Sequence, residues 1–150
     1  MYQIRPWLYN GKRSDMLDLD NIPRHNINAM LQLAERIKYP PDIAHLHLPI
    51  KDGVPLPKET LRTGVDFVLA EKARGHNAVI VCGTGASRSV GFSVAALKEA
   101  ESLSLLEALR SVRERHHPMA MPRPELWESL CSYYGEQVPF WEAFHETFGG

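Results

Sequence analysis

Residues 77–89, NAVIVCGTGASRS, join a short apolar run to a loop of small residues and then to the start of a predicted helix. The apolar run is rich in β-branched residues, as a buried strand is, and it ends at Cys82. Five small residues follow before Arg88, and these are Gly83, Thr84, Gly85, Ala86 and Ser87. A loop of small residues at a helix N-terminus can turn several backbone N–H groups toward one anion, and the positive end of the helix dipole adds to the attraction. The stretch therefore predicts a phosphate-binding site.

Cys82 and Arg88 stand at the two ends of this predicted loop. N–H groups that bind a phosphate would also stabilise a thiolate on Cys82, which would make its sulfur a nucleophile. The planar guanidinium of Arg88 can bind two phosphate oxygens at once. The simplest alternative is a buried cysteine at a strand end, followed by an ordinary glycine turn. The small residues within the loop and the hydroxyl of Ser89 after it favour the catalytic interpretation.

Together these residues resemble the signature loop of the cysteine-dependent protein tyrosine phosphatases, and the GxSRS motif at 85–89 is most similar to the small dual-specificity branch. The resemblance extends over nearly the whole chain. Residues 4–11, IRPWLYNG, resemble the entry strand of that family, and residues 43–53, IAHLHLPIKDG, resemble its strand and acid loop. Residues 119–127 resemble its closing loop and the helix that follows. The resemblance implies a cysteine phosphatase that needs neither a metal nor another cofactor.

Asp52 is the predicted general acid. It lies in a proline- and glycine-rich loop thirty residues before Cys82, and expulsion of an alkoxide from a phosphoester requires a proton donor. Taken alone, Asp52-Gly53 is also an ordinary turn-forming pair. The family places an aspartate at about this distance, which favours the acid. The resemblance further implies that backbone N–H groups of residues 83–88 bind the phosphate and that Ser89 donates a hydrogen bond to the sulfur.

Two residues depart from the family pattern. Val81 stands where the family usually has histidine, and this substitution predicts that Cys82 ionises less readily and that the pH optimum is higher. Arg123 stands where asparagine is frequent, which puts a hydrogen bond that braces the loop in doubt.

The predicted fold is a single α/β domain, with a central, largely parallel mixed sheet flanked by helices and the phosphate-binding loop between a strand and a helix. Residues 27–33 and 43–49 are predicted strands, and the apolar spacing within 58–75 predicts a helix ending at a glycine. Residues 2–9 are predicted to form an edge strand that ends at an Asn10-Gly11 turn. Residues 1–150 are then one catalytic domain of the dual-specificity phosphatase type.

Composition limits the partners that can be expected. The net charge is −1 and the charges are interspersed, so no basic patch predicts binding to nucleic acid or to a membrane surface. No apolar run has the length of a signal peptide or a membrane span, and two cysteines 49 residues apart suggest reduced thiols. We therefore expect a cytoplasmic protein. Its predicted partner is a phosphoprotein or another phosphomonoester.

His45 and His47 share one face of a predicted strand, but the sequence offers no third ligand at a recognisable spacing, and we predict no metal site.

The predicted activity is removal of phosphate from phosphotyrosine and from phosphoserine or phosphothreonine, since the chain has little room for elements that deepen the pocket of tyrosine-specific relatives. Two alternatives stay open. A pseudophosphatase would use the same loop to hold phosphoproteins without turnover, and a rhodanese-like sulfur transferase also places a cysteine at the base of an anion-binding loop.

Overall fold

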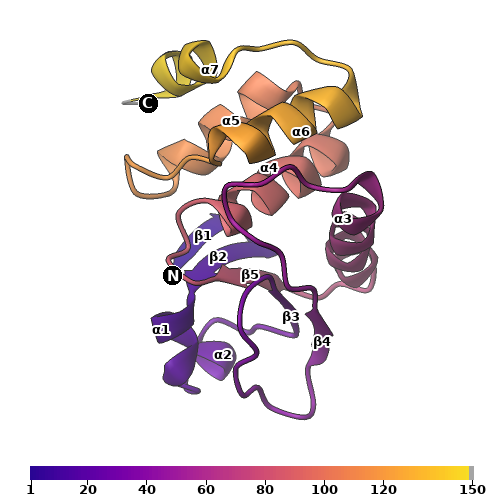
Figure 1. The fold of residues 1–150 in the computed structure, drawn as a ribbon. Helices are drawn as coiled ribbons and strands as arrows, with labels where there is room; N and C mark the ends of the chain where they lie inside the picture. The colour runs from indigo at the N-terminus through magenta and orange to yellow at the C-terminus, as the bar shows by residue number, and fades with distance from the viewer. Residues whose placement is uncertain (149–150) are drawn as a thin grey trace.

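The computed structural model describes residues 1–148, which form a five-stranded mixed sheet with helices on both faces (Figure 1). The strands are β1 (Tyr2–Arg5), β2 (Leu8–Lys12), β3 (Ala29–Gln32), β4 (Ala44–His47) and β5 (Ala78–Cys82). Their order across the sheet is β1-β2-β5-β3-β4, and every neighbouring pair is parallel except β1 and β2. This arrangement confirms the predicted fold class.

Seven helices surround this sheet within the described residues. They are α1 (Arg13–Leu17), α2 (Asn21–Arg24), α3 (Lys58–Ala73), α4 (Arg88–Glu101), α5 (Leu105–Glu114), α6 (Pro124–Tyr134) and α7 (Phe140–Thr147). In Figure 1, α4, α5 and α6 lie on one side of the sheet and the short helices α1 and α2 on the other. Among the helices of residues 1–148, none combines the length and hydrophobicity needed to cross a membrane.

Strand β5 lies at the centre of the sheet and is buried on both faces. Because side chains alternate along a strand, Ala78, Ile80 and Cys82 pack into the large core beneath the helical layer. Val79 and Val81 pack into the smaller core on the side of α1 and α2. A strand that is covered on both faces has an unbroken run of apolar residues, and this run allowed β5 to be predicted from the sequence. The alternation directs the thiol of Cys82 toward the side of α4.

The predicted turn at Asn10-Gly11 is wrong. Both residues belong to β2 and are buried, and the chain reverses instead at Pro6-Trp7, between β1 and β2. Parallel pairing of β2 with β5 overrides the local turn preference of this dipeptide. Gly11 serves close packing there, since a Cβ on it would lie 3.3 Å from Cγ2 of Val79. A polar side chain, that of Asn10, is thereby brought into the interior.

Candidate active site

The signature loop, residues 82–88, connects the end of β5 to the start of α4. Cys82 is the last residue of the strand and is only 1% exposed, and Arg88 is the first residue of the helix. The loop passes close to β2 at Gly85, whose φ is +70°. A Cβ on Gly85 would lie 3.0 Å from the carbonyl oxygen of Gly11, so glycine is required at this position on two grounds.

Ser89 contacts the sulfur of Cys82 through two groups. Its hydroxyl oxygen lies 3.2 Å from Sγ, and its backbone N–H donates to Sγ at 3.4 Å. Ser89 is fully buried in the first turn of α4, so these contacts are shielded from water. The backbone N–H of Ser89 at the helix N-terminus places positive partial charge next to the sulfur, and the hydroxyl is close enough to donate to the sulfur once it is a thiolate.

The guanidinium of Arg88 lies against the loop with part of its hydrogen-bonding capacity unused. Its Nη1 donates to the carbonyl of Ile50 at 3.0 Å, and a Cβ on Gly83 would lie 3.3 Å from its Nη2. Its Nε is buried without a partner among the described residues. Because buried donors are normally satisfied, the free N–H is a group that a bound oxyanion could occupy.

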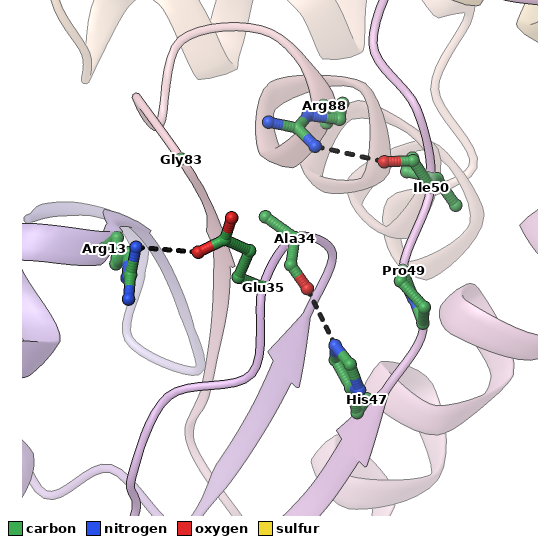
Figure 2. A pocket seen from close by; sticks show the side chains of 8 residues that line it. All are labelled: Arg13, Ala34, Glu35, His47, Pro49, Ile50, Gly83 and Arg88. Atoms are coloured by element: carbon green, nitrogen blue, oxygen red, sulfur yellow. Dashed lines mark hydrogen bonds and ion pairs between the residues drawn. The ribbon is translucent and has the colours of Figure 1, made fainter.

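Beside the loop is a cavity of about 480 Å³. It is lined by Arg13, Ala34, Glu35, His47, Pro49, Ile50, Gly83 and Arg88 (Figure 2). Arg13 and Glu35 form an ion pair of 2.9 Å, and Figure 2 shows this pair and the guanidinium of Arg88 on different sides of the cavity. Sequence patterns did not single out Arg13 or Glu35, because neither belongs to a motif.

Asp52 reaches the loop through a side-chain contact. Its Oδ1 accepts a hydrogen bond from the hydroxyl of Ser87 at 2.9 Å, and its Oδ2 pairs with Nε of Arg123 at 3.0 Å. The backbone N–H of Arg123 also donates to the Ser87 hydroxyl, at 3.1 Å. The acid loop, the signature loop and the start of α6 are therefore tied together. Arg123 stands where the family frequently has asparagine, and it braces the loop through its backbone N–H and its side-chain Nε.

Behind the loop lies a buried polar cluster that the sequence did not reveal. Asn10 on β2 donates from Nδ2 to the hydroxyl of Ser93 at 3.0 Å, and its Oδ1 lies 3.2 Å from the hydroxyl of Ser89. Nε2 of His116 lies 2.9 Å from the same Oδ1. The usable signal is a single polar residue, Asn10, within an apolar strand, but its pairing with Gly11 predicts a turn instead. His116 carried no signal, because it stands in a loop.

Val81, the other departure from the family pattern, faces away from this cluster. Its side chain is buried in the small core on the side of α1 and α2.

Comparison with known proteins identifies the class. Residues 8–136 match the family model described as the dual specificity phosphatase catalytic domain, which is most of the chain. The chain therefore belongs to the dual specificity phosphatase family, a class of cysteine-dependent protein phosphatases.

Individual relatives agree with this assignment. The chain is 30% identical over 140 residues to the human protein phosphatase Slingshot homolog 3, a match that covers 89% of this chain and 20% of that protein. It is 28% identical over 132 residues to human dual specificity protein phosphatase 15, covering 85% of this chain and 43% of that protein. The chain thus spans less than half the length of either relative. The crystal structure of human DUSP28 shares the fold, with a TM-score of 0.82 at 22% identity, over 90% of this chain and 96% of that one.

Proposed function

We propose that this chain is an active protein phosphatase that hydrolyses phosphotyrosine through a cysteinyl-phosphate intermediate, with phosphoserine and phosphothreonine as a second substrate class. The observation that carries the proposal is that one loop holds Cys82 and Arg88, is contacted by Asp52 through Ser87, and borders a cavity at Gly83 and Arg88. Family membership favours this phosphoryl chemistry over the sulfur-transferase alternative. The proposed catalytic residues are Cys82, Arg88, Asp52 and Ser89.

In the first step, the thiolate of Cys82 attacks phosphorus and the bond to the leaving oxygen breaks. The guanidinium of Arg88 and the N–H groups of residues 83–88 bind the three oxygens that do not react, and they stabilise the charge that develops on them. Asp52 donates its proton to the leaving oxygen, so that a neutral alcohol or phenol departs. The phosphoryl group is then bound covalently to sulfur.

In the second step, water attacks the cysteinyl-phosphate and the sulfur–phosphorus bond breaks. Asp52, now a carboxylate, accepts a proton from the attacking water, and inorganic phosphate is released. The electron pair of the broken bond returns to the sulfur as a thiolate. The hydroxyl of Ser89, 3.2 Å from Sγ, donates a hydrogen bond to that charge and makes the sulfur a better leaving group.

The proposal treats residues 1–150 as one catalytic domain acting on phosphoproteins in the cytoplasm. Both cysteines are free thiols, which suits a reducing compartment and a nucleophile that must stay reduced.

Hydrolysis of para-nitrophenyl phosphate tests the activity. We would measure it from about pH 4.5 to about pH 8.5 with EDTA present, for the wild type, for Cys82→Ser and for Cys131→Ser. Cys131 is the matched control, because it is the other cysteine and lies on α6, half-buried. We expect activity that survives chelation, disappears in Cys82→Ser and persists in Cys131→Ser. Absence of wild-type activity at every pH would reject turnover, and binding of phosphopeptides to the wild type would then identify a pseudophosphatase.

A further inference from the structure

We propose that Asn10 and His116 are positioning residues that leave the proton of the Ser89 hydroxyl free to stabilise the Cys82 thiolate. Neither residue touches the cavity in which the phosphate would react, and both would act through Ser89. The proposal deepens the function proposed above and rests on it for the consequences in turnover. Its central claim concerns the ionisation of one thiol, which can be measured without turnover.

The cluster behind the loop is assembled from four separate segments. Asn10 comes from β2, Cys82 from β5, Ser89 and Ser93 from α4, and His116 from the loop after α5. Asn10, Ser89 and Ser93 are fully buried, so each of their polar atoms depends on its neighbours for hydrogen bonds. In such a cluster the position of each proton is decided by the available acceptors.

The amide of Asn10 has one defined orientation. Its Nδ2 donates to the hydroxyl of Ser93 at 3.0 Å, which directs Oδ1 toward Ser89 and His116. That carbonyl oxygen has two lone pairs and two potential donors facing it. It can therefore accept from both, or from His116 alone.

The protonation state of His116 is set by its surroundings. Its Nδ1 accepts a hydrogen bond from the backbone N–H of His117 at 2.7 Å, so the ring hydrogen resides on Nε2 and is donated to Asn10 at 2.9 Å. Burial lowers the pKa of His116 to about 4, against the opposing effect of a hydrogen bond with the backbone of Gly85, and the ring is neutral at pH 7. It also stacks on the ring of Tyr2, with centroids 4.1 Å apart. His116 is therefore a neutral donor with a fixed orientation.

Ser89 has a single hydroxyl proton and two acceptors at equal distance. Asn10 Oδ1 and Cys82 Sγ each lie 3.2 Å from its oxygen. While Cys82 is a thiol, its S–H can donate to the serine oxygen and the serine proton goes to Asn10. When the sulfur becomes a thiolate, the serine proton is needed there.

The role of His116 follows from that transfer. If the Ser89 proton left Asn10 without a substitute, a buried carbonyl would lose its donor, at a cost comparable to that of a broken hydrogen bond. The N–H of His116 keeps the carbonyl of Asn10 satisfied in both states. Without His116, Asn10 would compete with the thiolate for the serine proton. The contacts thus favour the ionised form of Cys82.

Alkylation of Cys82 by iodoacetamide, followed against pH, tests the proposal. All variants carry Cys131→Ser, so that only Cys82 can react. We expect His116→Ala to move the midpoint of the alkylation profile upward by about half to one pH unit, the worth of one ordinary hydrogen bond. His116→Gln, which keeps an N–H donor at the end of its side chain, is expected to restore most of the shift.

Other ionisable groups must be considered in such a profile. Around the imidazole these are Tyr2, His117 and the amino group of Met1, and at the loop they are Arg88 and Asp52. All of them are retained in the His116 variants. A change in the midpoint that depends on the donor at position 116 therefore cannot arise from their removal.

A double-mutant cycle with Ser89→Ala shows whether His116 acts through Ser89. We expect Ser89→Ala to raise the midpoint by itself and His116→Ala to add nothing further in that background. In turnover, His116→Ala is expected to lower kcat about three- to tenfold with KM within about twofold, because the thiolate is affected rather than substrate binding. In an Asn10→Leu background, which removes the competing carbonyl, His116→Ala is expected to leave the midpoint unchanged.

An unchanged midpoint in His116→Ala would overturn the proposal, and so would an equal shift in the Ser89→Ala background. Either result can be obtained on a protein without phosphatase activity. Failure of this inference is therefore distinct from failure of the proposed function.

Discussion

The back of the signature loop and its front are built from different kinds of interaction. At the back, Asn10 and Ser89 are fully buried and joined by hydrogen bonds between neutral groups. At the front, Asp52 and Arg123 form an ion pair whose side chains are 30% and 62% exposed. Both sets of contacts reach the same loop of seven residues, the first at Cys82 through Ser89 and the second at Ser87.

The difference follows from what each side is proposed to do. Neutral dipoles held in a dry interior need little reorganisation when a thiolate forms, so they stabilise charge at a fixed position. An exposed ion pair contributes about 1 kcal/mol or less, because water competes for both partners. Asp52 can therefore leave Arg123 at small cost and turn to a substrate. The proposed site thus combines a rigidly held nucleophile with an acid that can be released.

The largest expected effect is at Arg88, the proposed phosphate-binding arginine that ends the loop. Arg88→Lys retains one positive charge but loses the planar pair of donors, and we expect kcat/KM to fall about 10³-fold. Steady-state hydrolysis of para-nitrophenyl phosphate measures it. The control is Arg110→Lys, a change at an arginine on α5 that pairs with Glu146 and is expected to stay within about twofold. A loss of less than about tenfold in Arg88→Lys would show that simple charge is sufficient in this loop.

The second prediction separates the acid from the nucleophile. Asp52→Asn removes the proton donor, and we expect kcat on a phosphoserine or phosphothreonine peptide to fall about 10²-fold. Para-nitrophenolate leaves without much assistance, so the loss on para-nitrophenyl phosphate should be smaller, about tenfold or less. Parallel assays of both substrates give the ratio. Equal losses on the two would argue that Asp52 supports the loop through Ser87 rather than donating a proton.

The same contrast explains what the sequence could predict. The strand at residues 78–82, the signature loop and the helix that follows it are specified locally, by a buried apolar run, small residues and a helix start, and they lie where the sequence predicts them. The strand at residues 44–47 and the helix at 58–73 also lie where apolar spacing placed them. The front of the loop could be predicted in part, since Asp52 stands in a loop that its prolines and glycine identify.

The back of the loop could not be predicted from the sequence, because it depends on contacts between distant segments. Asn10-Gly11 has the local preference of a turn, and only pairing of β2 with β5 makes it a strand. The contact between Asn10 and His116 joins residues 106 positions apart, and no pattern within either segment signals it. Arg123 illustrates the same limit, because its departure from the family pattern suggested a missing brace, whereas its backbone N–H and side chain supply one.

The third prediction concerns the stability of the back. Because burial lowers the pKa of His116 to about 4, the unfolded chain binds a proton more readily than the folded one below about pH 6.5. The folded state therefore has its full stability above about pH 6.5 and loses part of it as pH falls toward 4. We expect the free energy of unfolding to fall by about 2 kcal/mol over this range, after allowance for the partial exposure of His116. Urea unfolding of the wild type and His116→Gln at several pH values measures it, and an equally steep decline in both would contradict the assignment.

The smallest expected effect is at the front. Arg123→Ala removes the side chain that pairs with Asp52 but leaves the backbone N–H that donates to Ser87. Because the pair is exposed, we expect kcat/KM to change by less than about threefold and the salt dependence of activity to weaken. Phosphopeptide assays at about 50 mM and about 500 mM salt measure both. A loss above about tenfold would mean that Asp52 must be held by Arg123 during catalysis. The front of the loop would then be as preorganised as the back, and the distinction between a rigid nucleophile and a releasable acid would not hold.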